Sequence, residues 1–267
     1  MKITIFTSNS LRHFNLINKI SEISTQCNAI VETKTIFPGY VKDFFKQSVN
    51  IEKYFQKVRN AEIRYFEKNS YLKKNVNVKI LKHGDLNHLK KKDLKFALNS
   101  DIYIVFGSSF IKTNWLINFL IKKKAINIHM GLSPFYRGSS CNFWAIKDKK
   151  PEFVGSTIHY LSKGLDSGKI ISHCLPDYKQ KNCFNYTMSA VKSSHDCLKL
   201  LIKNNKLFKI TPKKQEKKYQ IRYSKNKEFN DLIVKKFLET SKKINIKNQT
   251  KRKLIEYLVN PYYFNKR

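Results

Sequence analysis

The chain has 267 residues and carries 53 basic against 19 acidic side chains, a formal net charge of +34. Its 41% of apolar residues predict a buried core, and 8 Gly with 6 Pro exclude collagen-like and Gly/Pro-rich low-complexity classes. The length is typical of one large domain, or of one domain with an appendage.

Strand and helix patterns alternate through the first half of the chain. The expected strands are 2–6, 29–37 (ending at Pro38-Gly39), 76–81, 101–106 and 125–129. The expected helices are 11–23, 41–72 (one helix or a pair) and 115–123. Because alternating strands and helices connect through right-handed crossovers, this order predicts an α/β fold with a doubly wound, mostly parallel sheet.

The composition changes after residue 205. Residues 206–227 are densely basic, and short helical patterns follow at 229–240 and 251–258. We therefore expect a catalytic domain over 1–205 and a short, basic, mainly helical appendage over 206–267.

The positive charge consists mainly of lysine, with 46 Lys against 7 Arg. Arginine forms bidentate hydrogen bonds with phosphates and base edges, and lysine does not. A solvated, lysine-rich surface is therefore the simpler interpretation of the charge. A nucleic-acid binder without catalytic activity stays open as an alternative.

Location and redox state follow from smaller signals. The first residues lack the pattern of a signal peptide, and no run of 18 apolar residues occurs. The five cysteines contain no CxxC pair, so neither a zinc site nor a disulfide framework is indicated. We expect a cytoplasmic protein with no membrane partner and no metal; the sequence indicates no oligomeric state.

The residues that carry chemistry lie between 127 and 173. Asn127 and His129 are two apart on a predicted strand and therefore project to the same face, at the carboxyl end where open α/β sheets bind ligands. An amide beside an imidazole can polarise a carbonyl and stabilise an oxyanion. Asp166, in a Gly-Leu-Asp-Ser-Gly turn, is a candidate to lie against His129 and favour its protonated form.

The surrounding pattern resembles the folate-dependent formyltransferase family. The signature is Asn-x-His, a Pro-x-Tyr-Arg-Gly loop, Trp-Ala, Gly-x-Thr-x-His and Asp-x-Gly-x-Ile. It is matched here by Asn127, His129, Pro134, Tyr136-Arg137-Gly138, Trp144-Ala145, Gly155, Thr157, His159, Asp166, Gly168 and Ile170. The resemblance covers about residues 1 to 200 at the level of the fold. Gly131 and Ser133 depart from the family, which usually has Ser and Leu at these positions.

The resemblance implies formyl transfer from 10-formyltetrahydrofolate to a primary amine, without a metal. Asn127, His129 and Asp166 take the catalytic roles. The residues implied to bind the folate cosubstrate are Phe106, Gly107, Ser108, Ser109, Phe110, Ile111, Gly164 and Leu165. The residues expected to contact the acceptor are Ser10, Arg12, Ser133, Tyr136 and Arg137.

The acceptor itself stays open among several alternatives. An amino-sugar nucleotide or another small, anionic amine is favoured, because the appendage is short and Thr7–Arg12 contains no glycine for close approach to a phosphate. Methionyl-tRNA and phosphoribosylglycinamide are the alternatives within the family. A formyltetrahydrofolate hydrolase is less favoured, because the first strand begins at Lys2 and leaves no preceding regulatory domain.

Overall fold

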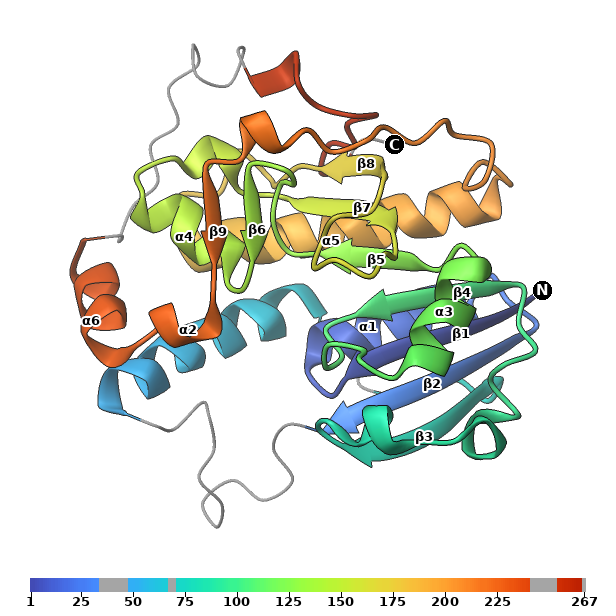
Figure 1. The fold of residues 1–267 in the computed structure, drawn as a ribbon. Coiled ribbons are helices and arrows are strands. Elements are labelled where there is room, and N and C mark those ends of the chain that lie inside the picture. Colours follow the sequence, from blue (N-terminus) through green and yellow to red (C-terminus); the bar gives the residue numbers. More distant parts are fainter. Residues whose placement is uncertain (34–47, 67–70, 241–253, 266–267) are drawn as a thin grey trace.

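The computed structural model describes residues 1–33, 48–66, 71–240 and 254–265. Its centre is a seven-stranded sheet of order β3-β2-β1-β4-β5-β7-β8 (Figure 1). Five strands are parallel: β1 (Lys2–Ser8), β2 (Gln26–Thr33), β3 (Val76–Lys82), β4 (Ile102–Phe106) and β5 (Ile126–His129). At one edge, β7 (Ser156–Tyr160) pairs antiparallel with β5, and β8 (Ile170–Cys174) pairs antiparallel with β7.

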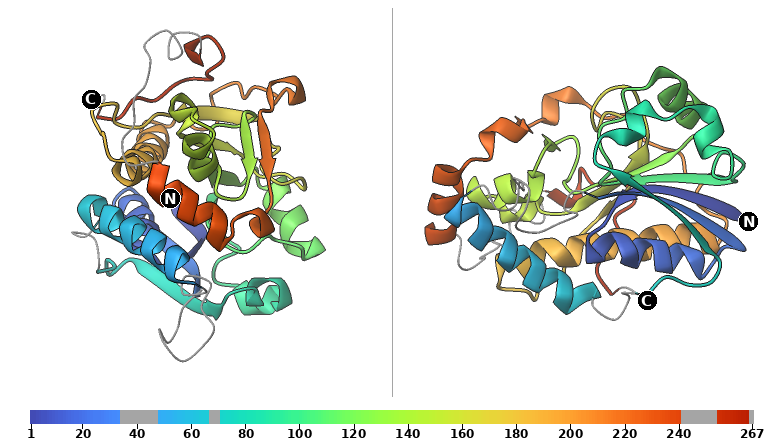
Figure 2. Two further views of the ribbon diagram at one scale, coloured as in Figure 1. Left: turned by 90° about the vertical axis from the view of Figure 1, so that its left-hand side faces the viewer. Right: turned by 90° about the horizontal axis from the view of Figure 1, so that it is seen from below.

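Helices cover both faces of the sheet (Figure 2). One face carries α1 (Leu11–Ser21), α2 (Val49–Phe66) and α5 (Cys183–Lys203), and the other carries α3 (Asn114–Lys122) with the 3-10 helices η3 (Asp85–His88) and η4 (Lys91–Leu94). The alternation of β1 explains the two cores, because Ile3 and Ile5 enter the larger cluster while Phe6 enters the smaller one. The predicted doubly wound α/β fold is confirmed.

Most predicted elements agree with the structure within a few residues. The second strand is displaced: β2 begins at Gln26 and is described to Thr33, and the expected remainder, 34–37, lies outside the described residues. The same holds for 41–47 and 67–70 of the expected long helix, whose described part is α2, and for 251–253 of the last expected helix.

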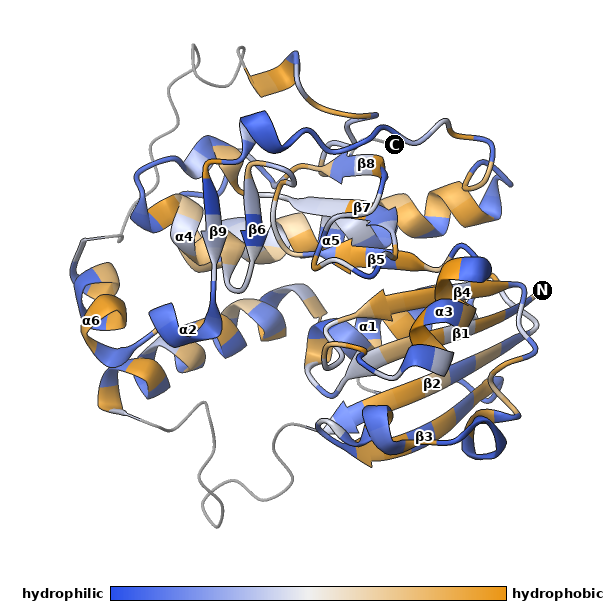
Figure 3. Ribbon diagram, viewed as in Figure 1, coloured by the Kyte–Doolittle hydropathy of each residue, from blue (hydrophilic) through white to orange (hydrophobic). Residues whose placement is uncertain are grey.

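The C-terminal segment is helical in part, as predicted, through α6 (Asp231–Thr240). It also contributes β9 (Arg222–Ser224), which pairs in parallel with β6 (Tyr136–Gly138). The sequence analysis predicted neither short strand. Figure 3 shows that β9 is hydrophilic, in contrast to β1 and β4, so no apolar alternation marks it. The remaining helices are α4 (Cys141–Lys147), η5 (Pro151–Phe153), η6 (Lys217–Tyr219) and η7 (Asn226–Glu228).

Aromatic side chains attach α6 to the main domain. Phe237 of α6 stacks on Phe143 of α4, with 4.4 Å between ring centroids, and lies 5.8 Å from Tyr54 of α2. Phe143, Phe229 and Phe237 are all buried, so this cluster is part of the larger core. The aromatic side chain of Phe143 therefore packs in the core.

Candidate active site

Asn127, His129 and Asp166 meet at the carboxyl end of β5. Asn127 and His129 are on the strand itself, and Asp166 comes from the loop between β7 and β8. His129 Nδ1 lies 3.2 Å from Asp166 Oδ2, and Asn127 Nδ2 lies 3.4 Å from Asp166 Oδ1. His129 and Asp166 are both largely buried, with 7% and 9% of their side chains exposed. The three residues that the sequence singled out are thus in mutual contact.

Both ring nitrogens of His129 face hydrogen-bond acceptors. Nδ1 faces the Asp166 carboxylate, and Nε2 lies 3.2 Å from the carbonyl oxygen of Tyr136. Neither partner can donate, so the doubly protonated imidazolium satisfies both contacts. Burial by itself would lower the pKa of His129, but Asp166 and the Cys141 thiol beside the ring outweigh it and raise the pKa well above its ordinary value.

Asp166 is held as the anion of this pair. Burial would raise the pKa of its carboxyl, but the charge and hydrogen bond of His129 lower the pKa well below its usual range. Oδ2 also lies 3.4 Å from the backbone N–H of Gly138, which donates to it. The backbone of Asp166 has φ +48°, in the left-handed region that few residues other than glycine adopt.

His159 and Thr157 hold the site from the neighbouring strand. In the β5–β7 register, His159 is opposite Asn127 and Thr157 is opposite His129. His159 Nδ1 lies 2.8 Å from the carbonyl oxygen of Tyr160 and so carries the proton, which leaves Nε2 to accept from Asn127 Nδ2 at 3.0 Å. Thr157 Oγ1 donates to Gly131 O at 2.6 Å. The Gly-x-Thr-x-His motif therefore orients the amide of Asn127 and anchors the following loop.

Gly131 leaves the space in which Cys141 approaches His129. A Cβ atom at Gly131 would lie 2.5 Å from Cys141 Cβ and 2.6 Å from His129 Nε2, closer than carbon atoms tolerate. Cys141 is buried, and its Sγ lies 3.5 Å from the carbonyl oxygen of Gly138. Because Gly131 has no side chain, Cys141 can pack beside the imidazole of His129. The sequence analysis gave Cys141 no role.

A buried carboxylate organises the loop expected to bind folate. Glu32, at the end of β2, accepts from the backbone N–H of Ser109 at 2.5 Å, from Ser109 Oγ at 2.9 Å and from the N–H of Gly84 at 2.8 Å. Within this loop the side chains of Phe106 and Ile111 are buried, whereas Phe110 is 51% exposed. A ligand at Phe106 and Ile111 would therefore meet backbone groups and not these side chains.

Gly107 and Ser108 complete this segment. Gly107 has φ +70°, and a Cβ atom there would lie 2.6 Å from His13 Nε2, so the turn requires glycine. Ser108 Oγ donates to the carbonyl oxygen of Ser109 at 3.2 Å.

Arg137 links the second folate-binding segment to the acceptor loop. Its Nη2 donates to the carbonyl oxygen of Leu165 at 2.6 Å, and its Nη1 to Gln220 Oε1 at 3.5 Å. Leu165 is 38% exposed and follows Gly164 in the loop that carries Asp166. Arg137 thus supports this loop through its hydrogen bond to Leu165.

Ser133 and Tyr136 require a correction. Both are buried, with exposed fractions of 0% and 1%, and neither side chain reaches solvent. The Tyr136 hydroxyl donates to Asp148 Oδ2 at 3.2 Å. The Ser133 backbone accepts from His173 Nε2 at 2.7 Å through its carbonyl oxygen. These side chains belong to the interior, so an acceptor would not meet them directly.

Ser10 and Arg12 lie at the same edge of the sheet but two strands away. They begin α1 directly after β1, and β4 separates β1 from β5. The backbone N–H of Ser10 donates to His13 Nδ1 at 3.1 Å, and Arg12 forms an ion pair with Glu62 of α2. The charge of Arg12 is therefore already paired.

The C-terminal segment supplies neighbours of the site that the sequence analysis missed. Arg222 of β9 lies 3.7 Å over the ring of Trp144 and forms an ion pair with Glu228 at 2.8 Å. Ser224 accepts from the backbone N–H of Ser139 at 3.0 Å through its carbonyl oxygen. Arg222, Ser224 and Glu228 lie outside the stretch covered by the family resemblance, so no motif indicated them.

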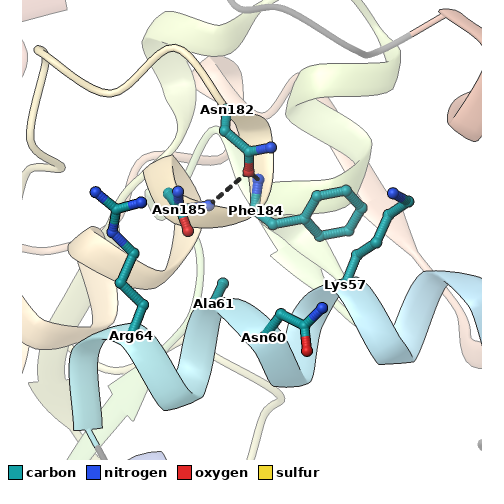
Figure 4. Close-up of a pocket in the computed structure, with 7 residues that line it drawn as sticks. All are labelled: Lys57, Asn60, Ala61, Arg64, Asn182, Phe184 and Asn185. Carbon is teal, nitrogen blue, oxygen red and sulfur yellow. Dashed lines mark hydrogen bonds between the residues drawn. The ribbon is translucent and has the colours of Figure 1, made fainter.

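A cavity of about 280 Å³ lies between α2 and the start of α5 (Figure 4). Its lining includes the cations Lys57 and Arg64, and Asn182 caps α5 by accepting from the backbone N–H groups of Phe184 and Asn185. None of the candidate site residues lines this cavity.

No group of three or more His, Cys, Asp and Glu side chains in the described ranges is placed to hold a metal ion. None of the described helices is long and apolar enough to cross a membrane.

The chain is similar to known formyltransferases. Residues 56–182 match the family model described as Formyl transferase, a stretch that contains Asn127, His129 and Asp166. A curated methionyl-tRNA formyltransferase of Staphylococcus epidermidis is 39% identical over 80 residues, which are 30% of this chain and 25% of that protein. The matched part thus spans about a quarter of that relative's length. The resemblance to the folate-dependent formyltransferase family is confirmed.

Solved structures share the fold over most of the chain. A 4-N formyltransferase from Francisella tularensis superposes with a TM-score of 0.52 at 19% identity, covering 99% of this chain and 93% of that one. The formyltransferase PseJ from Anoxybacillus kamchatkensis, in complex with UDP-4,6-dideoxy-4-formamido-L-AltNAc and tetrahydrofolate, gives 0.50 at 19% identity, covering 90% of each chain.

Proposed function

We propose that this chain transfers the formyl group of 10-formyltetrahydrofolate to a primary amine. The observation that carries the proposal is the contact between His129 and Asp166 beside Asn127, at the carboxyl end of a central strand. An imidazolium and an amide together supply the donors that an acyl-transfer oxyanion requires. The match of residues 56–182 to the formyl transferase family supports the same reaction.

Each of the three residues has a distinct task in this proposal. The neutral amine attacks the formyl carbon, and negative charge develops on the formyl oxygen. Asn127 Nδ2 and His129 Nε2 would stabilise that oxygen in place of their present acceptors, Asp166 Oδ1 and the carbonyl oxygen of Tyr136. Each donor contributes about 3–4 kcal/mol by comparison with oxyanion-hole donors. Asp166 orients His129, keeps it charged and relays the amine proton through water to the departing folate nitrogen.

The folate cosubstrate would lie against two loops. Residues 106–111 follow β4, and Gly164-Leu165 precede Asp166. Each loop exposes one large apolar side chain, Phe110 at 51% and Leu165 at 38%, which suits the flat ring of a pterin. Backbone groups of the same loops are available to its polar edge.

For the acceptor, we propose an amino-sugar nucleotide or another small, anionic amine. The described C-terminal segment is committed to contacts within the molecule through β9, which pairs with β6 beside the site, and through α6. Such a segment favours a small ligand over a bulky one. Arg137 donates to the carbonyl oxygen of Leu165, the residue before Asp166, so a guanidinium that could attract an anionic acceptor lies beside the site.

Methionyl-tRNA is the second candidate acceptor. The curated relative described above carries that activity in its name. Exposed lysines in 206–227, among them Lys213, Lys214 and Lys217, would suit a polyanion.

An acceptor screen with 10-formyltetrahydrofolate tests the proposal, with release of tetrahydrofolate as the readout. Amino-sugar nucleotides, phosphoribosylglycinamide and charged methionyl-tRNA are offered in parallel, and formylated product is identified by mass spectrometry. We expect acceptor-dependent release with an amino-sugar nucleotide. Release without any acceptor would indicate a hydrolase, and no release with any acceptor would contradict formyl transfer.

Matched histidine variants control the screen. His129→Ala should stay folded and lose nearly all transfer, because it removes the charged donor. His88→Ala, at an exposed histidine of η3, should keep wild-type turnover. Equal turnover of the two variants would contradict the assigned role of His129.

A further inference from the structure

The chain returns to the candidate site after α5, at the loop that carries Asp166. Lys213 and Ile170 form a pair of backbone hydrogen bonds, at 2.9 and 2.7 Å, which brings residues 213–215 alongside the end of this loop. Two residues later, Gln215 Nε2 donates to the carbonyl oxygens of Asp166 and Gly168, at 2.8 Å each. Both protons of the amide are therefore used on the backbone of one loop.

The orientation of this amide follows from chemistry. Both loop atoms are carbonyl oxygens, which only accept, so the NH₂ end of Gln215 must face them. The reverse orientation would set Oε1 against two oxygens. Gln215 thus acts as a clamp on residues 166–168, because its NH₂ group donates to the carbonyl oxygens at both ends of this segment.

Two backbone positions of this loop have an unusual geometry, which the hydrogen bonds from Gln215 stabilise. Asp166 adopts φ +48°, a left-handed conformation that is unfavourable for a residue with a side chain. Gly168 packs its Cα against the carbonyl oxygen of Tyr160, where no Cβ atom fits. The direction of the Asp166 carboxylate, and hence its contact with His129 Nδ1, depends on this backbone conformation.

We propose that Gln215 is a positioning residue that holds Asp166 against His129. It lies outside residues 56–182, the stretch matched to the family, and touches neither His129 nor the proposed reacting atoms. Its effect on catalysis rests on the proposed function; its effect on the His129–Asp166 contact does not.

The consequence of losing the clamp is a change in the protonation of His129. The groups that face His129 are Asp166 from the loop, Cys141 from α4 and the carbonyl oxygen of Tyr136, and His159 of β7 faces Asp166. Of these, only Asp166 is held by Gln215. When Asp166 moves away, burial of the ring is no longer outweighed and the pKa of His129 falls.

Titration of His129 by histidine-selective NMR in the full chain tests this, with His129→Gln used to assign the signal. In Gln215→Ala we expect the pKa of His129 to fall by about one pH unit or more, a tenfold change in the protonation equilibrium. Lys214→Ala, next to Gln215 but exposed, should leave it unchanged. An unchanged His129 titration in folded Gln215→Ala would overturn the proposal.

A second variant covers the case in which Gln215→Ala does not fold. Gln215→Met keeps the length of the side chain and removes both donors, and the same fall in the pKa of His129 is expected. If the wild type transfers formyl groups, the alkaline limb of its pH–rate profile should move to lower pH in both variants. If it transfers none, the proposed function fails, while the NMR titration still decides the role of Gln215.

Discussion

Asp166→Asn removes one charge from the site and keeps the shape of the side chain. In the wild type, Oδ2 accepts from His129 Nδ1 and from the N–H of Gly138, while Oδ1 faces the amide of Asn127. An asparagine at this position has one oxygen and one NH₂ group. Whichever way its amide turns, the NH₂ group faces a donor.

The size of the effect follows from the distance. Two unit charges 3.2 Å apart attract by about 5 kcal/mol at the effective dielectric constant of about 20 that is typical of proteins. Without that attraction, burial governs the pKa of His129, and the ring is neutral at pH 7. Losing a charged oxyanion donor costs about 3–4 kcal/mol of transition-state stabilisation, or roughly 100- to 1,000-fold in turnover. The donor–donor clash adds about 1–3 kcal/mol of destabilisation.

The assay compares formyl transfer by Asp166→Asn and wild type with the acceptor found in the screen. Thermal unfolding and circular dichroism establish that the variant is folded at the assay temperature. Asp85→Asn, at an exposed carboxylate of η3, is the matched control and should retain wild-type turnover. A folded Asp166→Asn with kcat/KM within a few-fold of the wild type would refute the reasoning.

Two further predictions concern stability. The pKa of His129 is raised on folding, so the stabilisation by its ion pair is complete below about pH 6.5 and is lost as pH rises through the folded-state pKa. The pKa of Asp166 is lowered on folding, so the stabilisation that Asp166 contributes is lost below about pH 4. Thermal unfolding should therefore show an alkaline decrease in Tm that His129→Gln lacks, and equal decreases would contradict this. Gly131→Ser restores the usual family residue but overpacks against Cys141 and His129, so urea unfolding should show a loss of about 1–3 kcal/mol, and no loss would argue against the close approach.

The sequence predicted the fold and the meeting of the three polar residues for definite physical reasons. The apolar strands with intervening helices identify a doubly wound sheet, and the two-residue period puts Asn127 and His129 on one face of β5. The carboxyl ends of parallel strands share one edge, where loop residues such as Asp166 converge. Local patterns and sheet geometry are therefore sufficient to predict the fold and the convergence of these three residues.

The supports of the site could not be predicted in the same way. Gln215 follows Asp166 by 49 residues, and β9 pairs with β6 some 85 residues away, so no short-range period connects them. Ser133 and Tyr136 show that the burial of individual side chains was also not predictable from the sequence. Both occur in a loop that would ordinarily be exposed, yet contacts with Thr157, His173 and Asp148 turn them inward.

The net charge of +34 and the buried carboxylates of the site have different effects on ligand binding. Among the few acidic side chains, Glu32 and Asp166 are buried at the same edge of the sheet, and each accepts backbone N–H groups from neighbouring loops. The His129–Asp166 pair is neutral as a whole, so the site adds little to the field of the surrounding lysines. That field favours the approach of anionic ligands such as folate and a phosphorylated acceptor, whereas the buried carboxylates fix the loops that would receive them.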